Sequence, residues 1–154
     1  MHAGVYLALL VVAGLAFSGS EAFGQAKNRD FFLGRYHWQK RVILVFMPAN
    51  ANSIGLDQLK LLQVNATALT DRDLVVLEVT GELVVGENVT SANGNQLRRQ
   101  FKVSPGTFTL VLIGKDGGEK YRSLQLTPPA KLFSIIDAMP MRQNEINSQK
   151  KQKQ

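Results

Sequence analysis

Apolar residues along this chain form two patterns: short unbroken runs, and one longer segment in which they recur every three or four positions. The runs at residues 41–47, 74–79 and 107–113 are rich in valine, isoleucine and leucine, which is typical of strands buried on both faces of a sheet. Over residues 56–69 the spacing predicts an amphipathic helix of about four turns. Because strand, helix and strand follow one another at these lengths, the first two strands are expected to be parallel.

The middle of the chain predicts smaller elements and a hairpin. Residues 83–85 are apolar and extend a strand, and residues 96–101 indicate a short helix. The glycine-rich sequence at 114–118 turns the third strand into an antiparallel partner over residues 119–126. Glycines supply the positive backbone angles of a tight turn, so we interpret 114–118 as a turn and not as a phosphate-binding loop.

A last helix completes the predicted fold. Thr127 is its expected N-cap and Pro128 its first helical residue, and Pro140 should end or kink it. The resulting order is strand, helix, strand, short helix, two hairpin strands and helix. This is the order of an α/β, thioredoxin-like fold, a central mixed β-sheet with helices on both faces, although another α/β sandwich is an alternative.

The N-terminus predicts export. Residues 5–17 form an apolar run of thirteen residues, shorter than the roughly 20 that span a bilayer, and small residues follow it. We interpret residues 1–22 as a signal peptide cleaved after Ala22, and a second acceptable cleavage site follows Ala26. No lysine or arginine precedes the apolar run, so an uncleaved anchor or a buried strand is the alternative. The expected divisions are a signal peptide at 1–22, an N-terminal extension at 23–40, the thioredoxin-like domain at 41–146 and a basic polar tail at 147–154. We expect no transmembrane segment in the mature chain. The expected location is periplasmic or extracellular.

The composition excludes several classes of function but does not indicate a specific one. With 154 residues, of which 45% are hydrophobic, the chain is long enough for one globular core. The net charge of +6 is scattered, which predicts no specific nucleic-acid binding. The chain has no cysteine, so thiol oxidoreductase and thiol peroxidase chemistry are excluded.

Four segments of the chain resemble a known family. They are residues 38–41, 71–74, 112–120 and 136–143. Together they resemble an uncharacterised domain-of-unknown-function family of the thioredoxin clan, which occurs in exported bacterial proteins and in animal extracellular-matrix proteins of the sushi-repeat and coiled-coil-domain-containing type. The resemblance covers about residues 33–145 and implies a peroxiredoxin-like or thioredoxin-like fold with no established activity.

Redox members of such a fold carry their cysteine where the first strand leads into the first helix, because a helix N-terminus lowers the pKa of the thiol. Here that corner, residues 48–54, contains Asn50, Asn52 and Ser53 and no thiol. A serine without a neighbouring base is no substitute. The proline expected at the start of the third strand is also absent, since Pro105 lies two residues before it.

Other catalytic and metal sites have little support. His37 is the one histidine beyond the predicted signal, and we interpret it as a packing or surface residue. Met139 and Met141 resemble a soft-metal pair, but methionine packing at a kinked helix is the better interpretation. Asn65 and Asn88 match the glycosylation pattern, with Asn88 the better acceptor. No cofactor and no metal are expected.

The leading hypothesis is an exported, non-enzymatic binding or interaction module of unknown ligand, whose partner is another protein or an extracellular polymer. One alternative is an enzyme of unknown type that uses the charged residues of the 114–118 turn and the last helix, and a second is a basic matrix or polyanion binder. A buried ion-pair network would favour a structural role for those charges, and an open pocket would favour an enzyme. The candidate binding residues are Lys115, Asp116, Asp137, Arg142, Asn50, Asn52 and Ser53.

Overall fold

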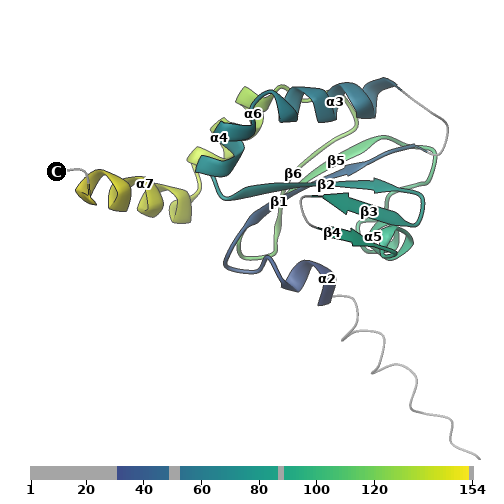
Figure 1. The fold of residues 1–154 in the computed structure, drawn as a ribbon, viewed down its shortest axis with the longest axis horizontal. Helices are drawn as coiled ribbons and strands as arrows, with labels where there is room; N and C mark the ends of the chain where they lie inside the picture. The colour runs from purple at the N-terminus through teal and green to yellow at the C-terminus, as the bar shows by residue number, and fades with distance from the viewer. Residues whose placement is uncertain (1–30, 49–52, 87–88, 153–154) are drawn as a thin grey trace, which may run out of the picture.

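The computed structural model describes residues 31–48, 53–86 and 89–152, and these form one six-stranded mixed sheet with helices on both faces (Figure 1). The order across the sheet is β4-β3-β2-β1-β5-β6. The predicted α/β architecture is therefore confirmed. The strands are β1 (Arg41–Phe46), β2 (Leu74–Thr80), β3 (Leu83–Gly86), β4 (Val89–Ser91), β5 (Thr109–Ile113) and β6 (Glu119–Ser123), and the helices are α2 (Phe31–Gly34), α3 (Ser53–Gln63), α4 (Ala66–Asp71), α5 (Gly94–Gln100), α6 (Pro129–Asp137) and α7 (Pro140–Gln152).

The central strand β1 organises the sheet. It pairs in parallel with β2, as the strand–helix–strand pattern predicts, and antiparallel with β5 on its other side. All six of its residues are buried, which confirms the expectation from its unbroken apolar run. Alternate side chains of β1 point to opposite faces of the sheet, so one strand contributes to two hydrophobic cores.

The two cores differ in the helices that cover them. Val42, Leu44 and Phe46 pack with residues of α2 and α5, whereas Ile43 and Val45 pack with residues of α3, α4 and α6. Each fully buried aliphatic side chain contributes about 2 kcal/mol to folding. The absence of disulfides in this cysteine-free chain is thus offset by a continuous core on each face of the sheet.

The single helix predicted over residues 56–69 is divided into α3 and α4. The break lies at Val64 and Asn65, between the end of α3 at Gln63 and the start of α4 at Ala66. The side-chain amide of Asn65 donates a hydrogen bond to the main-chain carbonyl of Leu61 at 2.8 Å. Asparagine competes in this way with the helical hydrogen-bond pattern, and a spacing of apolar residues does not reveal such competition.

The expected start of the last helix was wrong by one residue. α6 begins at Pro129 with Pro128 as its N-cap, and Thr127 is buried before it. The main-chain N–H of Thr127 donates to the side-chain oxygen of Gln58 at 2.7 Å, and the Gln58 amide donates back to the Thr127 carbonyl at 3.0 Å. This pair of bonds satisfies the buried Gln58 side chain and ties α3 to the start of α6.

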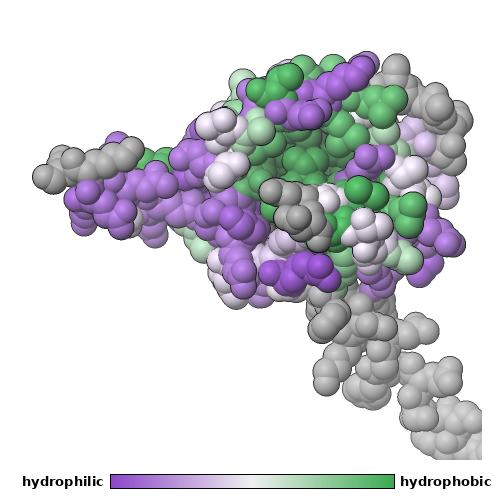
Figure 2. Space-filling model, in the orientation of Figure 1, coloured by the Kyte–Doolittle hydropathy of each residue, from purple (hydrophilic) through white to green (hydrophobic). Residues whose placement is uncertain are grey.

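The break expected at Pro140 is present, because α6 ends at Asp137 and α7 starts at Pro140. α7 then continues to Gln152, so most of the predicted polar tail at 147–154 is helical. Figure 1 shows α7 projecting from the body of the domain, and Figure 2 shows hydrophilic colour along it. By contrast, Figure 2 shows apolar colour on the surface next to α3. On β3, Leu83 and Val85 are exposed.

Gly94 at the start of α5 is expected to tolerate no side chain. A Cβ there would overlap the carbonyl oxygen of Gly81 and lie 2.7 Å from the carbonyl carbon of Glu82, both of which are backbone atoms of the β2–β3 turn. Gly94→Ala should therefore lower the free energy of unfolding by about 1–3 kcal/mol in a urea titration. Gly106→Ala is the matched control, because its Cβ would meet no atom within 4 Å and should change stability by less than about 0.5 kcal/mol. Equal stability of the two variants would contradict this packing.

Candidate functional site: a charge cluster and an adjoining cavity

The sheet topology gathers charged residues at one end of β1. Since β1 and β2 are parallel, the residues that precede both strands lie at the same end of the sheet, and the residues that follow the antiparallel β5 lie there too. The start of α7 adds two more charged side chains. The resulting charge cluster comprises Lys40, Arg41, Asp71, Arg72, Asp73, Lys115, Asp137, Arg142 and Glu145.

Arg41 is the most buried cation of the cluster, with 1% of its surface exposed. Its two terminal nitrogens donate to the two carboxylate oxygens of Glu145, at 3.1 and 3.0 Å. One of them also donates to the main-chain carbonyl of Arg72 at 2.7 Å. This bidentate geometry is the arrangement in which arginine and a carboxylate interact most strongly. It joins the first residue of β1 to the second turn of α7.

Arg142 is a second buried arginine that joins neighbouring segments through carboxylate partners. It is buried and donates to the Asp71 carboxylate, to the Asp71 main-chain carbonyl at 2.7 Å and to Asp137 at 3.4 Å. Arg72 donates to the other oxygen of Asp137 at 2.6 Å. Each of these guanidinium groups therefore has a carboxylate partner, which is the condition for keeping a charge out of water.

Lys115 lies between two carboxylates, those of Asp73 and Glu145, each 2.8 Å from its Nζ. Burial by itself would lower the pKa of Lys115, but the hydrogen bonds and charges of these carboxylates raise it above its usual value. Burial would likewise raise the pKa of Asp73 and of Glu145, and their cationic partners bring both below the usual range. All three groups are therefore charged at neutral pH, and Lys115 is a poor base or nucleophile.

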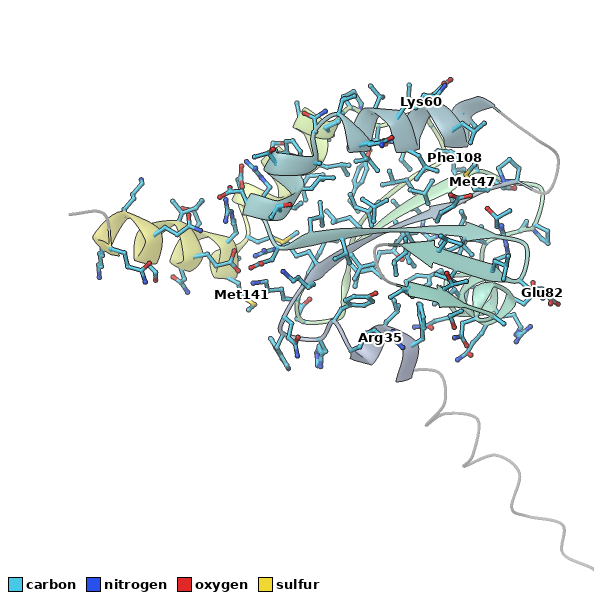
Figure 3. The ribbon with its side chains drawn as sticks, viewed as in Figure 1. Arg35, Met47, Lys60, Glu82, Phe108 and Met141 are labelled. Atoms are coloured by element: carbon cyan, nitrogen blue, oxygen red, sulfur yellow. The ribbon has the colours of Figure 1, made fainter. Side chains whose placement is uncertain are left out.

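A cavity of about 360 Å³ opens beside the cluster. One wall is apolar and comes from the junction of α6 and α7, where Figure 3 shows Met141. The opposite wall comes from Arg41 and from the β5–β6 turn, and it carries three cations and one carboxylate. The lining residues are Arg41, Gly114, Lys115, Asp116, Lys120, Ile135, Ala138, Met139, Pro140 and Met141.

Asp116 belongs to this cavity and not to the cluster. Its carboxylate accepts hydrogen bonds from the Lys120 ammonium at 2.6 Å and from the Gly118 N–H at 3.1 Å. The hydrogen bond from Lys120 lowers the pKa of Asp116, a larger effect than its slight burial, which acts in the opposite direction. Within the cluster five cations face four carboxylates, so the region beside the cavity has one positive charge in excess.

The structure brings three of the sequence-predicted site residues together and separates others. Lys115, Asp137 and Arg142 belong to one cluster, whereas Ser53 begins α3 beyond the opposite end of β1. Asn50 and Asn52 lie outside the described residues. His37 is at the surface, where its ring lies 4.7 Å from that of Trp38 between centroids, in keeping with a surface or packing residue.

Sequence reasoning missed Arg41 and Glu145. Arg41 looked like the polar edge of an apolar run, and Glu145 looked like one more polar residue in a polar segment. Asp71 and Asp73 flank Arg72 directly before a predicted strand, a position that a turn or a cap also explains. The one available signal was an arginine at the first position of a strand predicted to be buried on both faces, because a buried guanidinium requires an acidic partner elsewhere in the chain.

At the other end of β1, where a redox member of the fold would have its thiol, the described side chains are packed. Met47 and Phe108 lie together beneath α3 (Figure 3) and belong to the same core. A Cβ on Gly55 would overlap the sulfur of Met47, so the glycine allows α3 to approach this methionine closely. Residues 49–52, which complete this corner, lie outside the described part of the chain.

The lowered pKa of Glu145 predicts how stability depends on pH. A carboxylate whose pKa is lowered by folding stabilises the native state above the pKa of the unfolded chain, and this contribution is lost as the pH falls through the lower, folded value. Glu145→Gln leaves Arg41 and Lys115 without this partner and should cost about 3 kcal/mol at pH 7. Chemical unfolding at pH 7 and pH 3 should show the gap between wild type and variant narrowing at the lower pH. A gap that is constant, or that widens in acid, would contradict the assigned ion pairs.

Two solved structures with the same fold are similar to this chain. The chain is similar to thioredoxin peroxidase I of Plasmodium yoelii, with a TM-score of 0.57 and 15% identity over 73% of this chain and 79% of that one. It is also similar to the reduced 2-Cys peroxiredoxin of Plasmodium vivax, with a TM-score of 0.54 and 15% identity over 73% of this chain and 84% of that one. At this identity the similarity establishes a thioredoxin-like fold and nothing about activity.

The curated relatives are longer proteins. The chain is 28% identical over 145 residues to the human (Homo sapiens) sushi repeat-containing protein SRPX, covering 86% of this chain and 31% of that protein. It is 25% identical over 139 residues to coiled-coil domain-containing protein 80 of Danio rerio, covering 78% of this chain and 16% of that protein. The chain thus spans less than a third of the length of these relatives.

Within the described residues, no helix is long and apolar enough to cross a membrane. Residues 32–145 match the family model described as Domain of unknown function (DUF4174), which includes β1 through β6 and the start of α7. The chain therefore belongs to the DUF4174 family, and its domain has a thioredoxin-like fold.

Proposed function

We propose that this domain is a non-enzymatic binding module and that its ligand occupies the cavity between the β5–β6 turn and the α6–α7 junction. The observation that carries the proposal is the composition of that cavity: an apolar wall faces a wall with three cations, of which Lys115 and Arg41 are fixed by the charge cluster. Such a wall is preorganised, so a ligand orders few side chains when it binds.

The cavity composition indicates the ligand chemistry. A volume of about 360 Å³ is in the range of small-molecule sites and also accommodates one or two side chains of a peptide. Ile135, Met139 and Met141 offer an apolar surface, and methionine adapts well to irregular apolar groups. The excess positive charge favours a carboxylate or sulfonate at the other end of the ligand. We therefore expect an amphipathic anion with an apolar body.

The enzyme alternative uses the same charged residues and has weaker support. Lys115, Asp137 and Arg142 each contact opposite charges, and Asp116 accepts two hydrogen bonds. A general base or nucleophile needs a pKa close to the working pH, whereas the pKa of Lys115 is raised and that of Asp116 is lowered. These directions favour fixed charges over proton transfer.

The proposed setting is outside the cytoplasm. The apolar segment at residues 5–17 and the similarity to sushi repeat-containing proteins both favour export, as a periplasmic or extracellular protein. Thiol chemistry is excluded by the absence of cysteine, so the purified chain should show no peroxide reduction above the buffer rate with dithiothreitol as reductant. Turnover well above that rate would refute the binding-module proposal.

Binding in the cavity can be tested with 1-anilinonaphthalene-8-sulfonate, a dye with an apolar body and a sulfonate group. Its fluorescence should increase and shift to the blue with the native chain. Ala138→Trp fills the cavity from an exposed position and should weaken dye binding about tenfold or more, with an unchanged thermal unfolding midpoint.

Leu83→Ala is the control for this experiment, because it removes an exposed apolar side chain on β3, far in the sheet order from β5 and β6. It should leave dye binding unchanged. Loss of binding in Leu83→Ala but not in Ala138→Trp would place the dye on the open sheet surface and refute the cavity as the binding site.

A further inference from the structure

A second cavity, of about 440 Å³, lies at the opposite end of the sheet from the charge cluster. It is formed by the end of α5 and the loop that follows it. Three of its lining residues are cations and none is acidic. The lining residues are Asn95, Arg98, Arg99, Lys102, Val103, Ser104 and Pro105.

Arg98 forms the buried wall of this cavity and is 5% exposed. Its guanidinium donates to the main-chain carbonyls of Met47 and Val79, the latter at 3.1 Å, and lies 5.5 Å from the centroid of the Phe46 ring. Among the described residues, no carboxylate lies within ion-pair distance of it. The other buried cations, Arg41, Lys115 and Arg142, each have at least one such partner.

Among the described residues, the buried charge of Arg98 is therefore balanced only by neutral groups, namely main-chain carbonyls and the Phe46 ring. Burial lowers its pKa, which means that its surroundings disfavour the cation. An anion in the adjoining cavity would offset this cost. Glu82, a neighbouring carboxylate, accepts a hydrogen bond from Asn95 at 3.0 Å and does not line the cavity.

The backbone at Lys102 is a second unusual feature of this cavity. The Val103 N–H donates to the Arg98 carbonyl and the Lys102 N–H donates to the Arg99 carbonyl, at 2.8 and 3.3 Å, which is the Schellman arrangement that ends many helices. The position of Lys102 in this motif has φ of 53°, where glycine is strongly preferred. The chain has a lysine there, at a conformational cost, and its side chain lines the cavity.

From these observations we infer that the cavity formed by Arg98, Arg99 and Lys102 binds a tetrahedral oxyanion, that is, a sulfate or phosphate group, either free or as an ester on a larger molecule. Arginine and lysine side chains from one short segment match the several acceptor oxygens of such a group. The helix dipole accounts for cations in the last turn of α5. It does not account for the left-handed backbone of Lys102, nor for the lack of an ion-pair partner of Arg98 among the described residues. This site goes beyond the proposed function and is independent of the cavity beside the charge cluster.

The decisive variant is Lys102→Gly, because stability and binding should change in opposite directions. Glycine relieves the left-handed backbone, so the thermal unfolding midpoint should rise by about 2–4 °C. The same change removes one of three cations, so binding of inorganic sulfate should weaken about tenfold at low ionic strength, measured by nuclear magnetic resonance titration of the full chain. Arg99→Gln, at an exposed position, should weaken sulfate binding by a similar factor.

Lys60→Gln on α3 is the charge-matched control, since Lys60 is exposed and lies outside this cavity (Figure 3). It should bind sulfate as the wild type does, and so should Ala138→Trp, which fills the other cavity. Glucose 6-sulfate and inorganic phosphate are the further probes: tighter binding of the ester supports a sugar-borne group, and equal binding supports the free ion. The proposal is overturned if Lys102→Gly and Arg99→Gln bind sulfate like the wild type, or if Lys60→Gln loses as much affinity as they do.

Discussion

The guanidinium of Arg41 lies where the central strand begins, and much of the domain is arranged to keep it charged and out of water. β1 is buried along its whole length, so its first residue cannot reach solvent, and a buried cation is tolerated only with close anionic and carbonyl partners. Glu145 and the Arg72 carbonyl supply them from two segments far apart in sequence. The second turn of α7 is thereby held against the start of the sheet.

The remaining members of the charge cluster form further ion pairs between the segments at this end of the sheet. Arg142 connects the end of α4 to the end of α6, and Lys115 connects the β5–β6 turn to the segment before β2 and to α7. Ion pairs of this kind cost desolvation energy that offsets much of their attraction, so their main effect is to specify how the segments meet. One consequence is a cavity whose charged wall is rigid and whose apolar wall comes from the α6–α7 junction.

At the opposite end of β1 the described side chains belong to a packed hydrophobic core. Met47 and Phe108 pack closely beneath α3, which approaches Met47 at Gly55, whereas the similarity to peroxiredoxins concerns the fold alone. On the other face of the same end, Arg98 uses main-chain carbonyls in place of carboxylates. Within the described residues, the two ends of the sheet thus stabilise buried arginines in different ways: one with carboxylates in a nearly neutral cluster, the other with main-chain carbonyls beside a basic cavity.

The order of the main elements from β1 to α6, the parallel β1–β2 pair, the break at Pro140 and the lack of thiol chemistry followed from the sequence, because apolar periodicity, proline and residue type act locally. The short elements α2 and β4 and the helix α7 were not predicted. The split between α3 and α4 and the start of α6 did not follow from the sequence, since they coincide with side-chain hydrogen bonds: Asn65 donates to the Leu61 carbonyl, and Gln58 exchanges two bonds with the Thr127 main chain. Only the tertiary structure paired Arg41 with Glu145, which lie 104 positions apart, and placed Arg98 where no carboxylate of the described residues forms an ion pair with it. The pairing of charges depends on how the strands and helices pack in space. No local pattern in the sequence specifies which distant residues come within ion-pair distance.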